Sequence, residues 1–211
     1  MKKIVIIDYS LGNLFSVNQA LVNSGANVCI SDKPTDLLEA DAVVLPGVGA
    51  FNEAMGNLQK SKLDKAILDC IKQGKPFLGI CLGMQLLFNN SEEFGSTNGL
   101  GIIDGTIKKF KSSGYQKVLV PQVGWNTISA PKNMNWEKTI LKGTNENTYM
   151  YFVHSYYALP KNAENVLSET TYSDIKYCSA VIKDNVTATQ FHPEKSGEEG
   201  LRIYTNWLNT I

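Results

Sequence analysis

The pentapeptide Gly79-Ile80-Cys81-Leu82-Gly83 places a cysteine between two glycines. The residues before it, Pro76 to Ile80, favour a buried strand, and residues 82–88 favour a helix. A cysteine on such a strand-to-helix turn resembles a nucleophile elbow, in which glycines tolerate the crowding and the side chain projects above the sheet edge. The N–H groups and positive dipole end of the following helix favour the thiolate, the reactive form of cysteine. Cys81 is therefore the candidate nucleophile.

The remaining cysteines, Cys29, Cys70 and Cys178, are scattered and carry no flanking glycine pair. We interpret them as small buried hydrophobic side chains. The absence of a C-x-x-C pair argues against a zinc ribbon and against a dense disulfide framework. We expect neither a metal nor a cofactor.

A cysteine nucleophile normally needs a base, and the base needs a group that orients it. The sequence offers two histidines, His154 and His192. Pro193 favours an extended conformation for His192, and residues i and i+2 of an extended chain point to the same side, so Glu194 can fix the His192 ring. His154 has no carboxylate two residues later, so it ranks second, either as the competing base or as a structural histidine.

The segment Pro46-Gly47-Val48-Gly49 follows an apolar run at residues 41–45. Glycines let the backbone approach a ligand and present N–H groups without side-chain obstruction. Together with the N–H of Leu82, the backbone of Val48 and Gly49 could stabilise the oxyanion of an acyl transfer. An ordinary turn is the alternative interpretation.

The first half of the chain alternates between short apolar runs and amphipathic segments. The sequence predicts strands at 4–7, 41–45 and 76–80, and helices at 13–24 and 63–73. This alternation indicates an α/β fold with three layers, in which helices flank a mostly parallel central sheet.

The second half favours an additional β-rich segment. Strands are expected at 101–110, 117–120, 148–153, 178–182 and 186–191. A helix at 200–211 is expected to close the chain, and its predicted apolar face consists of Leu201, Tyr204, Leu208 and Ile211. No long linker separates the halves, so we expect one domain over residues 1–211.

The composition excludes several classes of protein. Twenty Lys and Arg residues balance twenty Asp and Glu residues, which argues against a nucleic-acid binder. No apolar stretch approaches the roughly 20 residues of a membrane helix. The first eight residues lack the length and cleavage site of a signal peptide, so we expect a cytoplasmic protein.

Taken together, these motifs resemble the class I glutamine amidotransferases, whose pattern is a G-x-C-x-G elbow, a glycine-rich oxyanion loop and a late H-P-E. Further segments are similar to the family of glutaminase subunits of imidazole glycerol phosphate synthases, from about residue 4 to 208. These segments are Asp8-Tyr9 with Gly12-Asn13, Pro121 with Gly124-Trp125-Asn126, the run from Tyr151 to Tyr156, and the run from His192 to Gly197.

The resemblance implies a glutaminase that converts L-glutamine to glutamate and ammonia. Cys81 would form a glutamyl thioester, His192 would shuttle protons and Glu194 would hold His192. The resemblance also implies the residues that hold glutamine, namely Gln85 and the backbone around Gly49, Leu82, Ser155 and Tyr156.

The resemblance further implies a partner, a (β/α)₈ barrel cyclase that receives the ammonia through a tunnel. In histidine biosynthesis this heterodimer makes imidazole glycerol phosphate and AICAR. The chain is too short to contain such a barrel itself, which takes about 250 residues. The positions that would face the partner are Asn13, Trp125, Tyr151 and Lys195.

Two positions depart from the family pattern on the side where partner contact is expected. Gln122 stands where the family usually has histidine, and Ser10 stands where it usually has glycine. A paralogous subunit that supplies ammonia for amidino sugars of surface polysaccharides is therefore a competing hypothesis. Two further hypotheses are a non-catalytic partner-binding module, against which the intact Cys81, His192 and Glu194 argue, and a general cysteine hydrolase.

Overall fold

The computed structural model describes residues 2–111 and 118–211. Its strands are β1 (Lys3–Ile7), β2 (Asn27–Ser31), β3 (Ala42–Leu45), β4 (Phe77–Ile80), β5 (Phe88–Ser91), β6 (Thr97–Asn98), β7 (Ile103–Lys109), β8 (Gln122–Ile128), β9 (Thr148–His154), β10 (Tyr156–Pro160), β11 (Val166–Tyr172), β12 (Ile175–Lys183) and β13 (Val186–Thr189). Its α-helices are α1 (Leu14–Asn23), α2 (Pro34–Glu39), α3 (Phe51–Lys60), α4 (Leu63–Lys72), α5 (Leu82–Leu86) and α6 (Gly197–Leu208), and its short 3₁₀ helices are η1 (Trp136–Lys138), η2 (Ala163–Asn165) and η3 (Pro193–Lys195).

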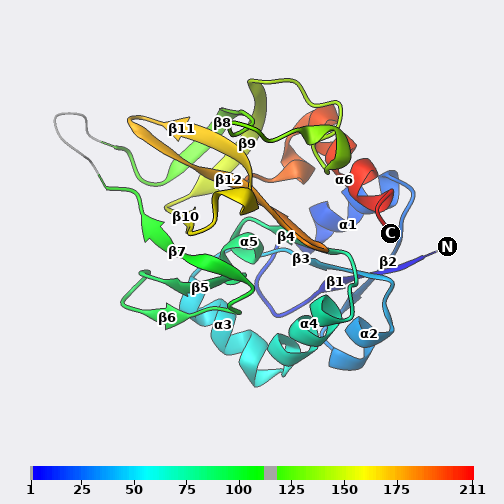
Figure 1. Cartoon of the computed structure of the whole chain (residues 1–211). Helices are drawn as coiled ribbons and strands as arrows, with labels where there is room; N and C mark the ends of the chain where they lie inside the picture. The colour runs from blue at the N-terminus through cyan, green and yellow to red at the C-terminus, as the bar shows by residue number, and fades with distance from the viewer. Residues whose placement is uncertain (1, 112–117) are drawn as a thin grey trace.

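A large mixed sheet forms the centre of the molecule (Figure 1). Its strands follow the order β2-β1-β3-β4-β13-β12-β10-β7-β5-β6, and β11 pairs with β12 off this path. The strands from β2 to β13 run parallel, whereas β12 and β10 continue the sheet antiparallel. The three-layer α/β fold and the β-rich second half predicted from the sequence are therefore confirmed.

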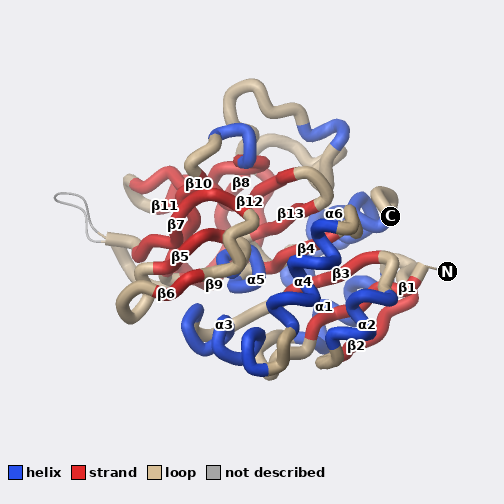
Figure 2. The backbone as a smooth tube through the Cα atoms, turned by 60° about the horizontal axis from the view of Figure 1, so that its bottom comes forward, coloured by secondary structure: helices blue, strands red, loops and turns tan. Residues whose placement is uncertain are grey.

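Helices cover the parallel strands on both faces, and the strand residues alternate between the two covers. Val5 and Ile7 of β1 face α2, α3 and α4, whereas Ile4 and Ile6 face α1 and α6. Figures 1 and 2 show these two sets of helices on opposite sides of the sheet. Burial on both faces explains why the first-half strands are continuous apolar runs.

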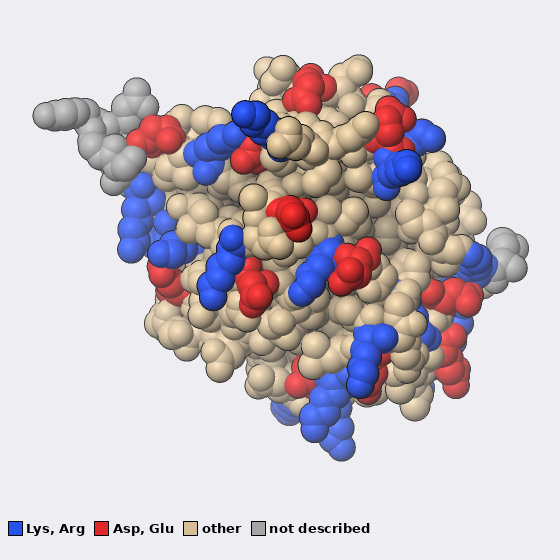
Figure 3. All heavy atoms as spheres, in the orientation of Figure 1, with Lys and Arg blue, Asp and Glu red and all other residues tan. Residues whose placement is uncertain are grey.

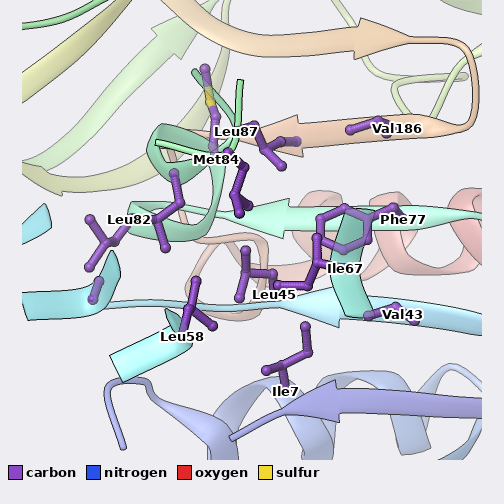
Figure 4. Close-up of a cluster of buried hydrophobic side chains, with 14 of the residues drawn as sticks. Ile7, Val43, Leu45, Leu58, Ile67, Phe77, Leu82, Met84, Leu87 and Val186 are labelled. Carbon is purple, nitrogen blue, oxygen red and sulfur yellow. The ribbon is translucent and has the colours of Figure 1, made fainter. Parts of the chain in front are cut away.

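The side of the sheet that α2, α3 and α4 cover also anchors α5, the helix that follows Cys81. Leu82 and Met84 of α5 belong to the same buried cluster as Leu45 of β3 and Leu58 of α3, as Figure 4 shows. Burying one such side chain stabilises a fold by roughly 1.5–3 kcal/mol. The position of the elbow therefore depends on well-packed core residues.

Strands β8 and β9 form a separate antiparallel pair, in which Trp125 lies opposite Tyr151 and Gln122 lies opposite His154. An isolated bridge between Ser129 and Glu169 connects this pair to β11. The pair carries two of the four residues expected at the partner surface, Trp125 and Tyr151, and His154 at the end of β9 lines the cavity of the site.

Most predicted elements of the first half are confirmed within one or two residues, but three details of the sequence prediction were wrong. The helix predicted at 82–88 ends at Leu86, because Phe88 already pairs in β5. Residues 118–120 form no strand, and residue 117 lies outside the described residues. Helix α6 runs from Gly197 to Leu208 instead of 200–211.

The predicted face of this last helix was also wrong in part. Its buried side is formed by Gly200, Ile203, Tyr204 and Trp207, while Leu201 is 37% exposed. The prediction missed β2, α2, α3, β5, β6, β8, β10 and β11.

The face of the molecule drawn in Figure 3 has no concentration of one charge, because basic and acidic side chains are interspersed on it. Among the described residues, no helix has both the length and the apolar character that crossing a bilayer requires.

Candidate active site

Cys81 occupies a strained backbone turn between β4 and α5. Its φ of 54° and ψ of −110° lie outside the regions that L-residues normally adopt. Gly83 is packed so tightly that an added Cβ would lie 1.8 Å from the Leu45 carbonyl oxygen, and a Cβ on Gly79 would lie 3.0 Å from Ala188 Cβ. The close packing explains both glycines of the predicted elbow.

The end of β13 holds this turn from the other side. The Cys81 N–H donates to the Thr189 carbonyl over 2.7 Å, and Thr189 pairs with Ile80 in the parallel register. Since parallel strands end at the same sheet edge, the residues that follow β13 lie beside the nucleophile. The sheet thus brings Cys81 and His192, which are far apart in sequence, to one place.

His192 and Glu194 form a buried pair. His192 Nδ1 and Glu194 Oε1 are 2.7 Å apart, and the two side chains are 3% and 1% exposed. The Tyr204 hydroxyl donates to the other oxygen, Glu194 Oε2, over 3.4 Å. The i, i+2 relation predicted between His192 and Glu194 is present, although Glu194 lies in η3 and not in a strand.

The second ring nitrogen of His192 has a different environment. Nε2 is buried and has no hydrogen-bond partner among the described residues. Burial lowers the pKa of His192, but the nearby Cys81 and the hydrogen bond and charge of Glu194 outweigh burial and raise this pKa above its ordinary value. This imidazole can therefore hold a proton next to the sulfur.

His154 also approaches the site, but its nitrogens are both engaged. Nδ1 lies 2.8 Å from the Tyr156 carbonyl oxygen, and Nε2 lies 3.3 Å from the Tyr177 hydroxyl. Burial is the main reason that the pKa of His154 falls to about 4. A neutral ring with both nitrogens occupied fits the structural role that the sequence left open for His154.

A cavity of about 310 Å³ opens next to Cys81. Its lining residues are Val48, Gly49, Cys81, Leu82, Gln85, Glu93, Pro121, Val153, His154, Ser155 and Tyr156. The predicted oxyanion and substrate-binding residues therefore all contribute to one cavity. His192 and Glu194 are not among its lining residues.

Sequence reasoning missed Glu93, the only carboxylate among these lining residues. Its Oε2 accepts the Phe51 N–H at the start of α3 over 2.6 Å. Burial, and then the charge of Glu93, raise the pKa of Tyr156. No local sequence pattern distinguishes Glu93 from other surface carboxylates, because Glu93 reaches the cavity through tertiary contacts.

The Pro46–Gly49 loop has a fixed part and a freer part. The Tyr9 hydroxyl donates to the Pro46 carbonyl over 2.8 Å, and a Cβ on Gly47 would lie 2.2 Å from the same hydroxyl oxygen. Val48 is 40% exposed, and Gly49 has a φ of +100°. In this structure the Leu82 N–H donates to the Gly47 carbonyl over 3.4 Å, so the loop itself occupies this donor.

Three of the residues expected at the partner surface gather around one aromatic pair. The rings of Trp125 and Tyr151 meet edge to face with centroids 6.0 Å apart, and Lys195 Nζ lies 5.7 Å from the centre of the Tyr151 ring. Trp125 is 56% exposed. Asn13 caps α1, which packs against η3.

The two departures from the family pattern have different structural settings. Ser10 is exposed with a φ of +69°, a backbone conformation that suits glycine. Gln122 is only 2% exposed, and its side-chain amide lies 3.0 Å from the Tyr177 hydroxyl oxygen. The expectation that Gln122 lies on the partner surface was wrong, because its side chain points into the buried network of His154.

Comparison with known proteins gives the family. The model of the family described as "Glutamine amidotransferase class-I" matches residues 5–210. The chain belongs to the class I glutamine amidotransferases. The resemblance inferred from the motifs is thus confirmed.

Individual relatives show which amidotransferase subunits this chain resembles. It is 47% identical over 206 residues to the imidazole glycerol phosphate synthase subunit HisH of Wolinella succinogenes, covering 96% of this chain and 97% of the relative. It is 46% identical over 210 residues to the same subunit of Methanosarcina mazei, covering 99% and 98%.

Solved structures agree with the amidotransferase fold. The chain matches PurLQS from Thermotoga maritima with a TM-score of 0.71 at 20% identity, covering 100% of this chain and 99% of that one. It matches a glutamine amidotransferase from the same organism with a TM-score of 0.63 at 15% identity, covering 99% and 84%. At these identities, the matches support the fold alone.

Proposed function

We propose that this amidotransferase is the glutaminase subunit of an imidazole glycerol phosphate synthase, acting as one domain over residues 1–211 in the cytoplasm. The observation that carries the catalytic assignment is the buried His192–Glu194 pair beside a cysteine on a strained elbow. The high identity to HisH subunits over nearly the whole chain supports the pathway, histidine biosynthesis.

The proposed reaction has two steps. The Cys81 thiolate attacks the carboxamide carbon of L-glutamine, and His192 gives its proton to the leaving nitrogen, so that ammonia departs and a glutamyl thioester remains. Water then attacks the thioester, His192 takes a proton from the water, and the C–S bond breaks to release glutamate. Glu194 holds the His192 tautomer and balances the imidazolium charge.

The cavity offers one acidic group and several polar groups for recognition of an amino acid. Glu93 is placed to pair with the α-ammonium group of L-glutamine, since it is the acidic group among the lining residues. Gln85, Gly49, Leu82, Ser155 and Tyr156 provide side-chain and backbone groups around the substrate. A bound ligand shields the Glu93 carboxylate from water. A ligand without an ammonium group would leave this carboxylate unpaired, and the free-energy cost of that loss favours amino acids as substrates.

The oxyanion site requires a change in the loop. With the Leu82 N–H donating to the Gly47 carbonyl, the site lacks a free donor at that position. Reorientation around Val48 and Gly49 would release the Leu82 N–H and present a loop N–H to the tetrahedral intermediate. Gain or loss of one such donor changes the rate by about 10²–10³.

The proposed partner is the (β/α)₈ barrel cyclase, which would receive the ammonia. Trp125, Tyr151 and Lys195 form an aromatic and basic cluster on β8, β9 and η3, with Asn13 on the neighbouring helix. Aromatic residues are enriched at protein interfaces, and Tyr and Trp supply a large contact area at a low cost in conformational entropy. The buried position of Gln122 removes one reason to favour the amidino-sugar paralogue.

The test is steady-state glutamine hydrolysis by the purified chain alone, then with the cyclase subunit of the same organism, and then with the acceptor nucleotide added. We expect slow hydrolysis alone and an increase of about 10²–10³ in the full mixture. Cys81→Ser should still bind the cyclase but show no hydrolysis. Full activity of the isolated chain, or no binding of the cyclase, would contradict the proposed subunit role.

A further inference from the structure

Among the described residues, Gln190 is the one fully buried side-chain amide that contacts the sulfur of Cys81. It follows the last residue of β13 and lies two positions before His192. Its side chain is 0% exposed, and its Nε2 donates to Cys81 Sγ over 3.7 Å. The steps of the proposed reaction use His192 and Glu194 and leave Gln190 without a role.

The direction of this amide follows from its neighbours. Gln85 Nε2 lies 2.9 Å from the Tyr156 carbonyl oxygen, which can only accept. The same nitrogen lies 2.9 Å from the Gln190 side chain, so Gln190 must present its oxygen to Gln85. Its nitrogen then faces the sulfur, because the two ends of an amide point in opposite directions.

The Tyr156 carbonyl oxygen, to which Gln85 donates, has a second contact that fixes the same direction. The Tyr156 carbonyl oxygen also lies 2.8 Å from His154 Nδ1, so both contacts to this oxygen come from donors. A carbonyl oxygen has two lone pairs and can accept both. The orientation of Gln190 is therefore fixed by a continuous set of hydrogen bonds from β10 through Gln85.

We propose that Gln190 is a positioning residue for the nucleophile, whose N–H holds the Cys81 sulfur in its anionic form and whose orientation is set by the substrate-contacting Gln85. This inference rests on the proposed function, because it assigns a role in glutamine hydrolysis.

The chemistry distinguishes this donor from His192. The imidazolium gives its proton away when ammonia leaves, so it cannot stabilise the sulfur at every stage. The amide N–H of Gln190 is retained throughout, because an amide does not titrate near neutral pH. When the C–S bond of the thioester breaks, the electron pair returns to sulfur, and the Gln190 N–H is already in place to receive the negative charge. A hydrogen bond to a charged group is about twice as strong as a neutral one.

Two variants of the full-length chain, Gln190→Met and Gln190→Leu, remove the donor with side chains of different shape. The probe is iodoacetamide, an uncharged reagent that alkylates thiolates, and peptide mass spectrometry separates Cys81 from the other cysteines. At pH values below the midpoint of the wild-type alkylation profile, both variants should alkylate Cys81 about tenfold more slowly than the wild type. The pH of half-maximal alkylation should rise by about one unit, since one unit corresponds to a tenfold change in thiolate population.

Turnover provides a second measurement, made in the complex with the cyclase subunit. In both variants kcat for glutamine hydrolysis should fall about tenfold, and KM should change less than kcat, because the contact of Gln85 with Tyr156 is kept. The matched control is Ser168→Ala, which removes the buried Ser168–Ser179 hydroxyl contact of 2.8 Å in the same sheet without touching the sulfur. This control should keep the wild-type alkylation profile.

Three outcomes decide the matter. Upward-shifted alkylation profiles in both Gln190 variants, with an unshifted control, support the positioning role. Unshifted profiles in both variants overturn it, even if kcat falls, because a purely structural residue would lower activity without changing the titration of the sulfur. A wild-type complex that does not hydrolyse glutamine overturns the proposed function and this inference with it, so the two failures are distinguishable.

Discussion

The two histidine regions of the site are built from similar parts and produce opposite results. His192 follows β13, and the Glu194 carboxylate contacts one of its ring nitrogens. Its second ring nitrogen lies near a thiol and has no hydrogen-bond partner among the described residues. His154, at the end of β9, has a carbonyl on one nitrogen and a tyrosine hydroxyl on the other. The pKa of His192 is raised because Cys81 and Glu194 outweigh burial, whereas burial dominates and lowers that of His154.

The difference teaches that burial alone does not assign a histidine to catalysis. Both residues are nearly inaccessible, at 2% and 6% exposure, so exposure does not separate them. What separates them is a nearby charge and an available nitrogen. A base needs both, because it must hold a proton and must have an atom available to exchange it.

The largest expected effect comes from exchanging the two histidines for neutral side chains. His192→Ala should lower kcat by about 10³, within the range of about 10²–10⁴ for a positioned acid–base group. His154→Asn keeps a donor close to the Tyr156 carbonyl and should lower kcat by less than about tenfold. Steady-state glutamine hydrolysis in the cyclase complex measures both. If His154→Asn is the more damaging change, the base must be reassigned.

A smaller effect is expected when the charge is removed but the shape of the pair is kept. Glu194→Gln leaves an oxygen that can accept from His192 Nδ1 but no longer balances an imidazolium. We expect a fall in kcat of about ten- to hundredfold, less than for His192→Ala, because an orienting group is partly dispensable. The control is Glu199→Gln, which removes only an exposed ion pair to Arg202. Equal losses in the Glu194 and Glu199 variants would remove Glu194 from the proposed triad.

The smallest effect concerns stability against pH. The pKa of His154 is about 4 in the folded state and about 6.5 in the unfolded state, so only the unfolded chain binds this proton between these values. Stability from His154 is therefore present above pH 6.5 and is lost as the pH falls towards 4, by at most about 3 kcal/mol. In urea unfolding, the His154→Asn variant should therefore lose less free energy of unfolding than the wild type as the pH falls from 6.5 to 4.

His192 should behave in the opposite sense in the same unfolding measurements. Its folded pKa is raised, so its contribution is present below pH 6.5 and is lost as the pH rises through the folded value. His192→Ala should therefore change the slope on the alkaline side only. Identical slopes for wild type and both variants would show that the two regions do not differ in the way the structure indicates.

The three residues of the proposed triad could be singled out from the sequence because their signals are local. The elbow needs glycines at fixed positions around Cys81, and Glu194 follows His192 by two residues, so each of these two parts has its own sequence signal. The sheet then brings the two parts together, because β13 pairs with β4. The parallel half of the fold was predictable for a related reason, since strands buried on both faces are continuous apolar runs.

Other parts depended on contacts between distant segments. Glu93 reaches the cavity from the loop after β5, and Tyr204 reaches Glu194 from α6, so neither has a neighbouring motif to mark it. Strands β8 and β10 mix polar and apolar residues because each is only partly buried. In α6, apolar residues support two helical faces, and only packing against the sheet selects Ile203 and Trp207 over Leu201.

The packing of Gly83 against the Leu45 carbonyl has a consequence for genetics. The space left for a side chain at Gly83 is smaller than one methyl group, since an added Cβ would sit 1.8 Å from that oxygen. A selection for histidine prototrophs would therefore discard every amino-acid change at this position, just as it would at Cys81. The two kinds of loss have different origins, because one removes the reacting atom and the other removes the turn that presents it. The amount of folded protein in the discarded clones distinguishes the two causes, since changes at Gly83 should lower it and changes at Cys81 need not. A list of tolerated codons alone does not distinguish them.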